Sequence, residues 1–153
     1  MMDTDAMLQL DQTMVYIAED DALSQRMLAT FLKKEPFNFE IFSDGSSLLE
    51  AARQQTPDLF LLDVMMPQLD GFATCRLLKK DLHLAHIPVL FLTADATDNA
   101  KEQGFVEGGV DYITKPYKQR ELIMRIRTHL RLKKAMDKLT EYNAWLEKQL
   151  REQ

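Results

Sequence analysis

The sequence predicts an α/β fold in which helices cover both faces of a doubly wound parallel sheet. Short apolar runs alternate with longer segments of helical periodicity along the first 130 residues. The runs are MVYIA (14–18), FEIF (39–42), LFLL (59–62), PVLFL (88–92) and VDYIT (110–114). Three of them are apolar throughout, which is typical of strands that are buried on both faces. Repeated βα units of this length predict right-handed crossovers between parallel strands.

The segments between these runs have the spacing of amphipathic helices. In residues 22–34, Leu23, Met27 and Leu28 recur at the spacing of one helix face. Residues 45–55, 71–82 and 99–109 are the next predicted helices. From residue 117 to residue 153 the chain has neither Gly nor Pro, so we expect one unbroken helix there. These elements predict a flexible segment at 1–12, a globular domain at 13–130 and a helical extension at 131–153.

The helical extension carries a heptad pattern. Its core positions, alternately four and three residues apart, are Leu132, Met136, Leu139, Asn143, Leu146 and Leu150. This is the a/d spacing of a coiled coil, and Asn143 falls at an a position, where Asn favours two-stranded pairing in one register. We therefore predict a homodimeric coiled coil. The alternative is a single amphipathic helix that folds back on the globular domain.

Composition excludes several classes of protein. The net charge of −5 and the pI near 5.2 argue against direct nucleic-acid binding, which requires a basic surface. Cys75 is the single cysteine of the chain, as is typical of a reducing compartment. No apolar segment reaches the roughly 18 residues that span a membrane, and the acidic N-terminus does not resemble a signal peptide. We expect a soluble, cytoplasmic protein without membrane contact.

Polar residues follow the predicted strands at the edge where the carboxyl ends of a parallel sheet meet. Their order along the chain is Glu19, Asp20, Asp63, Thr93 and Lys115. Two carboxylates about 4 Å apart repel by roughly 4 kcal/mol at an effective dielectric constant near 20. A divalent cation held by few carboxylates and by water relieves this repulsion, which favours Mg²⁺. A carboxylate beside a cation, a lysine and a hydroxyl has what attack on a phosphoryl group requires. The neighbouring acids Asp21 and Asp70 are interpreted as helix caps rather than ligands.

At these positions the sequence resembles the receiver domain of bacterial two-component response regulators. The likeness covers roughly residues 13–130. It rests on the pair Glu19-Asp20, the DxxMPxxDG segment from Asp63 to Gly71, Thr93-Ala94 and Lys115-Pro116. The resemblance implies a flavodoxin-like, chemotaxis-regulator-like (βα)5 fold with strand order 2-1-3-4-5.

The resemblance also implies roles for the acids. Asp63 would be the phosphoacceptor. Asp20 and Asp63 would bind Mg²⁺ directly, the backbone carbonyl of Met65 would complete the protein ligands, and Glu19 would act through water.

The phosphoryl group would be contacted by residues of the fourth and fifth strand ends. Thr93, Ala94 and Lys115 would bind it, and Tyr112 would be the switch aromatic that moves when Thr93 moves. The bond between Lys115 and the following proline would be cis.

Two further positions are those that set the lifetime of the phosphoryl group in this family, Met65 and Asp95. An apolar Met cannot orient an attacking water molecule, whereas Asp95 can. We hypothesise that Met65 favours a long-lived phosphoaspartate.

The function implied is a phosphoacceptor signalling module rather than an enzyme. Its partner would be a sensor histidine kinase or a phosphotransfer protein. Phosphorylation would alter the face formed by the fourth and fifth helices of the (βα)5 domain, and with it dimerisation or the geometry of the coiled coil. A receiver that leads into such a helix resembles receiver–diguanylate cyclase regulators, whose output domain this chain lacks.

Two other functions stay open at this stage. One is a stand-alone regulator that acts through protein contacts. The other is a small phosphatase with an aspartyl-phosphate intermediate, which is disfavoured because Met65, two residues after Asp63, cannot donate a proton.

Overall fold

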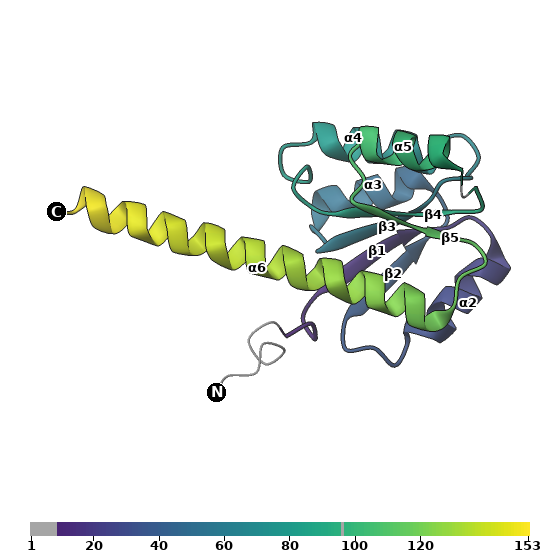
Figure 1. Ribbon diagram of the computed structural model, residues 1–153, viewed down its shortest axis with the longest axis horizontal. Coiled ribbons are helices and arrows are strands. Elements are labelled where there is room, and N and C mark those ends of the chain that lie inside the picture. The colour runs from purple at the N-terminus through teal and green to yellow at the C-terminus, as the bar shows by residue number, and fades with distance from the viewer. Residues whose placement is uncertain (1–8, 96) are drawn as a thin grey trace.

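The computed structural model describes residues 9–95 and 97–153 and contains one parallel sheet of five strands (Figure 1). The strands are β1 (Met14–Ala18), β2 (Asn38–Phe42), β3 (Leu59–Asp63), β4 (Val89–Thr93) and β5 (Asp111–Thr114). They are hydrogen-bonded in the order β2-β1-β3-β4-β5. The predicted fold and strand order are therefore confirmed, and each strand lies within one residue of its predicted bounds.

Helices cover both faces of the sheet. They are α2 (Ala22–Leu32), α3 (Gly45–Gln54), α4 (Gly71–Lys80), α5 (Asp98–Val106) and α6 (Gln119–Arg151). Helices α2 and α6 lie on one face, and α3, α4 and α5 on the other (Figure 1). In β3, Leu59 and Leu61 pack toward α2 and α6, whereas Phe60 and Leu62 pack toward α3 and α4. This double burial explains why the strand is apolar throughout.

Side-chain caps start the helices that follow β1, β2 and β3. Asp21, Asp44 and Asp70 each accept a hydrogen bond from the backbone N–H three residues later, at 2.7–2.8 Å. Such caps satisfy N–H groups that the first turn of a helix leaves without partners. The interpretation of Asp21 and Asp70 as caps is confirmed.

Helix α6 is 33 residues long and spans roughly 50 Å at 1.5 Å per residue. Its first part packs on the sheet through Leu122, Ile126 and Leu130, which are fully buried. Beyond them the helix projects away from the domain, and side chains 138–148 are all exposed (Figure 1). The alternative of a helix folded back on the domain is therefore wrong. Among the described residues, no helix combines the length and apolar character needed to cross a membrane.

Residues 1–8 of the predicted N-terminal segment lie outside the described residues. Within the rest of that segment, Leu10 is buried in the core between the sheet, α2 and α6. Close packing thus begins before Thr13, the predicted start of the domain.

Candidate metal and phosphoryl site

The carboxyl edge of the sheet collects the polar residues predicted from the sequence. Ala18 pairs with Leu62, so Glu19 follows β1 at the level at which Asp63 ends β3. Thr93 pairs with Thr114 and thereby brings Lys115 to the same edge. The topology explains why residues 96 positions apart in the chain become neighbours.

Lys115 joins two buried carboxylates. Its Nζ lies 3.0 Å from Oε1 of Glu19 and 3.0 Å from Oδ2 of Asp63. Glu19 is 0% exposed and Asp63 is 4% exposed. Buried charges require partners, and one ammonium shared by two carboxylates leaves the cluster with excess negative charge. The peptide bond between Lys115 and Pro116 is cis, as the resemblance implies.

The pKa directions follow from this arrangement. Burial raises the pKa of Glu19, and the adjacent Asp63 raises it further against the opposing effect of Lys115. For Lys115, burial acts to lower the pKa, but the hydrogen bonds and charges of the two carboxylates prevail and raise it. Lys115 is thus protonated and supplies a fixed positive charge, whereas the ionised form of Glu19 is destabilised by burial and by Asp63.

The three acids are close enough to share a cation. Carboxylate oxygens of Glu19, Asp20 and Asp63 lie within 4.8 Å of one another, with Asp20 exposed and the other two buried. A set of hard oxygen donors that is open to solvent on one side fits Mg²⁺, which retains several waters.

The loop after β3 folds back over Asp63. The backbone N–H of Met65 donates to Oδ1 of Asp63 at 3.1 Å, which brings the Met65 peptide beside the acids. A Cβ atom at Gly71 would lie 2.5 Å from the carbonyl oxygen of Asp63. The DG pair Asp70-Gly71 therefore has two structural roles, since Asp70 caps α4 and Gly71 permits its close approach to β3.

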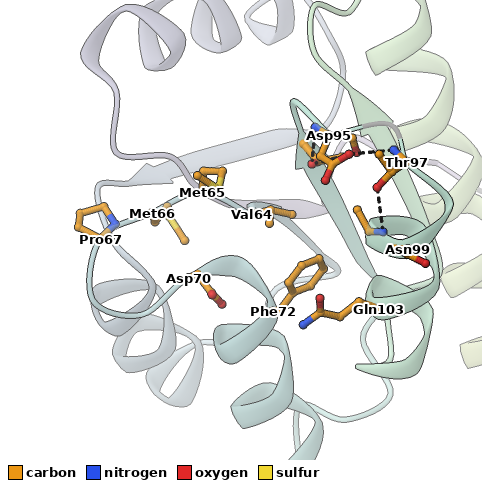
Figure 2. Close-up of a pocket in the computed structure, with 12 residues that line it drawn as sticks. Val64, Met65, Met66, Pro67, Asp70, Phe72, Asp95, Thr97, Asn99 and Gln103 are labelled. Carbon is orange, nitrogen blue, oxygen red and sulfur yellow. Dashed lines mark hydrogen bonds between the residues drawn. The ribbon is translucent and has the colours of Figure 1, made fainter.

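Thr93 is hydrogen-bonded within its own loop. Its hydroxyl donates to the carbonyl oxygen of Asp95 at 3.3 Å and accepts from the Asp95 N–H at 3.0 Å. Asp95 in turn accepts from the N–H of Thr97 at 2.9 Å, which lowers the pKa of Asp95 (Figure 2). Thr97 then caps α5 by accepting from the N–H of Ala100. A chain of hydrogen bonds thus links Thr93 to the start of α5. Ala94, between Thr93 and Asp95, is exposed.

A cleft of about 850 Å³ opens between the loop after β3 and α5 (Figure 2). Its lining includes Met65 and Thr93, which adjoin the acid site, and Phe72, Asn99 and Gln103. Met65 is 74% exposed, so its side chain borders the route by which a reactant or water reaches Asp63. Asn99 and Gln103 could not be predicted from the sequence, because nothing in their local pattern distinguishes them from ordinary helix-surface residues.

Tyr112, the predicted switch aromatic, lies on β5 against α5. Its ring packs edge-on to Phe105, with centroids 5.9 Å apart, and Nζ of Lys101 lies 4.8 Å from the ring centre. The ring is half-buried. Movement of α5 would therefore change the surroundings of Tyr112 directly.

The environments of two side chains near these elements were not predicted from the sequence. His129 lies on α6 with its Nε2 3.1 Å from Oδ2 of Asp111, the first residue of β5. A step of seven residues back from Met136 would have placed His129 at a heptad position. Tyr117, after the cis proline, is buried, and burial raises its pKa to about 12. Its hydroxyl has no hydrogen-bond partner among the described residues, and no sequence signal reveals this.

Comparison with known proteins agrees with this geometry. The model of the response regulator receiver domain family matches residues 15–127. The chain belongs to this family. It is 38% identical over 117 residues to the DNA-binding response regulator MtrA of Mycolicibacterium paratuberculosis, covering 76% of this chain and 51% of MtrA. It is 36% identical over 130 residues to the response regulator PleD of Caulobacter vibrioides, covering 85% of this chain and 29% of PleD. The chain thus spans about half or less of the length of these relatives.

Solved structures show the same receiver fold. A putative response regulator from Chloroflexus aurantiacus has a TM-score of 0.74 and 29% identity, with 77% of this chain and 97% of that chain covered. The receiver domain of a sensor histidine kinase from Pseudomonas aeruginosa has a TM-score of 0.72 and 25% identity over 77% of this chain and 97% of that chain. That structure has a magnesium ion coordinated in its active site cleft.

Proposed function

We propose that this receiver domain accepts a phosphoryl group on Asp63 from a sensor histidine kinase or a phosphotransfer protein. The observation that carries the proposal is the shared contact of Lys115 with Asp63 and Glu19, 3.0 Å from each, beside the exposed acid Asp20. An acceptor carboxylate next to a fixed positive charge and a set of hard oxygen donors is what phosphoryl transfer needs.

In the proposed reaction a carboxylate oxygen of Asp63 attacks the phosphorus atom of a phosphohistidine. The new P–O bond forms as the P–N bond breaks, and the electron pair of that bond leaves with the imidazole nitrogen. Lys115 balances charge on the phosphoryl oxygens. A bound Mg²⁺ would supply further charge neutralisation, held by Asp20, Asp63 and the carbonyl of Met65, with Glu19 acting through water.

The response to phosphorylation would begin at Thr93. To bind a phosphoryl oxygen, the Thr93 hydroxyl must leave the backbone of Asp95, to which it is hydrogen-bonded at 3.0 and 3.3 Å. The backbone N–H of Ala94, an exposed residue directly after Thr93, would follow it toward the phosphoryl group. Because Asp95 is connected through Thr97 to the cap of α5, this change would shift α5 and the packing of Tyr112 against Phe105.

We infer that the output of this signal is a change in how two copies pair through α6. The heptad residues at 132–150 support this, because they are exposed in the single chain although they are mostly apolar. The paired helices would then control an output domain, of which diguanylate cyclase is the type that the receiver-plus-helix arrangement resembles, or a separate partner protein. We place this signalling in the cytoplasm, without direct contact between these residues and nucleic acid or a membrane.

The experiment that tests the proposal treats the protein with a small-molecule phosphodonor and Mg²⁺ and measures its mass. We expect one phosphoryl group on the wild-type chain and none on Asp63→Ala. Asp70→Ala, which removes an acid from the same loop, is the matched control and should still be phosphorylated. Equal phosphorylation of Asp63→Ala and wild type would refute the proposal. The phosphatase alternative predicts hydrolysis of general phosphomonoesters, which the same samples can exclude.

A further inference from the structure

A groove of about 560 Å³ lies where α6 leaves the domain. Pro88 and Val110, which directly precede β4 and β5, line its domain side. Leu132 and Met136 of α6 line the other side. Since Pro88 and Val110 mark the amino ends of parallel strands, the groove is at the opposite edge of the sheet from Asp63.

The charged groups around the groove are already paired. Nζ of Lys133 lies 2.5 Å from Oδ2 of Asp137, and His129 is hydrogen-bonded to Asp111. An apolar lining remains, in which Val110 is 45%, Leu132 55% and Met136 63% exposed. Apolar side chains that are clustered and exposed in this way are typical of a surface that another chain covers.

The helix side of the groove is continuous with the heptad pattern. Leu132 and Met136 are the first d and a positions of the extension, and His129 lies seven residues before Met136. The predicted seam between two helices therefore starts inside the groove, against the receiver domain, rather than beyond it. Past the groove only Leu139, Asn143, Leu146 and Leu150 remain in the seam, and so short a helix pair with a polar layer is marginal in water.

We propose that the groove is filled by α6 of a second copy of this chain, so that each receiver domain clamps the first heptad of its partner's helix. The proposal rests on the dimer inferred above and specifies where that dimer is anchored. Asn143 favours parallel helices, because it then meets Asn143 of the other copy, whereas an antiparallel pair would set it against a leucine at a d position.

The small side chain of Ala135 supports this arrangement. In a parallel pair the g position of one helix meets the e position of the other in the next heptad. Ala135 is at g, and the e position that it meets is Thr140, which lines the groove. Ala135 is exposed in the single chain. A residue without bulk at this point lets the second helix approach the domain wall at Val110.

The test is the dimer dissociation constant, measured by sedimentation equilibrium on the 153-residue chain. Val110→Glu puts a charge on the domain wall, outside any helix, and should weaken the dimer by about tenfold or more. Val106→Glu, an exposed valine at the end of α5 that does not line the groove, is its matched control and should change the constant less than about twofold.

Ala135→Glu is the second variant, because a change on the exposed surface of α6 leaves the domain fold intact. Glu at a g position is well tolerated in an ordinary coiled coil. A loss of about tenfold in affinity therefore reports crowding in the groove. Ala144→Glu, on the outer face of the same helix, should leave the dissociation constant unchanged.

Leu146→Glu separates this inference from the dimer on which it rests. If Leu146→Glu dissociates the dimer but Val110→Glu and Ala135→Glu leave it unchanged, the coiled coil stands and the groove is not part of it. Weakening by Val106→Glu instead would place the interface on α5 and overturn the groove proposal. A wild-type chain that is monomeric at all concentrations would refute both the dimer and the groove.

Discussion

The two halves of α6 contain the same residue types in opposite environments. Leu122, Ile126 and Leu130 are fully buried against the sheet, whereas Leu139 and Leu150 are 56% and 69% exposed. In the first half, these apolar residues are four positions apart, which is typical of a helix that packs on a core. The second half has the alternating steps of a coiled coil. The difference indicates that the first half is completed within the chain, while the second half is built for a partner.

The largest predicted difference between the two halves of α6 comes from truncating one leucine in each half. Leu130→Ala should lower the free energy of unfolding by about 3 kcal/mol, since it removes a buried side chain and leaves a cavity. Leu139→Ala, in the same helix, should change it by less than about 0.5 kcal/mol at a concentration where the chain is monomeric. Urea unfolding of both variants measures this. A comparable loss from Leu139→Ala would mean that the extension packs on its own domain.

The junction between the two halves is tested by Asp111→Asn. Burial acts to raise the pKa of Asp111, but hydrogen bonds from His129, Arg125 and the Tyr112 N–H prevail and lower it. A carboxyl whose pKa is lower in the folded state stabilises the fold above its usual pKa of 3.8, and this stabilisation disappears as the pH falls through the folded value. We expect a loss of about 1–2 kcal/mol at pH 7 from Asp111→Asn.

Unfolding at pH 7 and at pH 3 checks both the size and the sign of this effect. The loss should shrink at the lower pH, because the stabilisation from a carboxyl with a lowered folded pKa disappears as the pH falls below its usual value of 3.8. Glu121→Gln, which alters an exposed ion pair with the same Arg125 at 3.5 Å, should cost less than about 0.5 kcal/mol. A loss from Asp111→Asn that is independent of pH would assign its cause to packing rather than charge.

The smallest predicted effect concerns Met65, an exposed apolar residue that we do not assign to the interface between two chains. Met65 is 74% exposed beside the acid site, where we expect it to deny an attacking water a hydrogen-bond partner. Met65→Asn should shorten the half-life of phosphorylated Asp63 by about threefold, the effect of one weak hydrogen bond to water. Met124→Asn, an exposed Met on α6, is the control. Equal half-lives for wild type and Met65→Asn would disprove the lifetime hypothesis.

The strands and the acid site were predictable from the sequence because both depend on local patterns that the fold converts directly into positions. Apolar runs predicted β1, β3 and β4, and the shared carboxyl edge of parallel strands then placed Asp63 beside Lys115. The partners of each group were less predictable. Lys115 was expected to face phosphate, but its contact with Glu19 was not predicted; it forms because a buried carboxylate requires a partner of opposite charge.

The groove could not be predicted from the sequence, for a related reason. It is formed by Val110 and Pro88, which precede strands, and by Met136, which belongs to a helix more than 20 positions later. Their proximity depends on the angle at which α6 leaves the domain, and no periodicity in the sequence specifies that angle. The contact of His129 with Asp111 depends on the same angle and could not be predicted either.

The measurement that tests the central claim most directly is the dimer dissociation constant of the 153-residue chain with and without phosphodonor and Mg²⁺. If phosphorylation of Asp63 acts on the pairing of α6, the constant should fall by about tenfold in wild type and stay unchanged in Asp63→Ala. Equal constants in wild type, with phosphorylation verified by mass, would contradict the claim that the acid site controls the exposed half of α6.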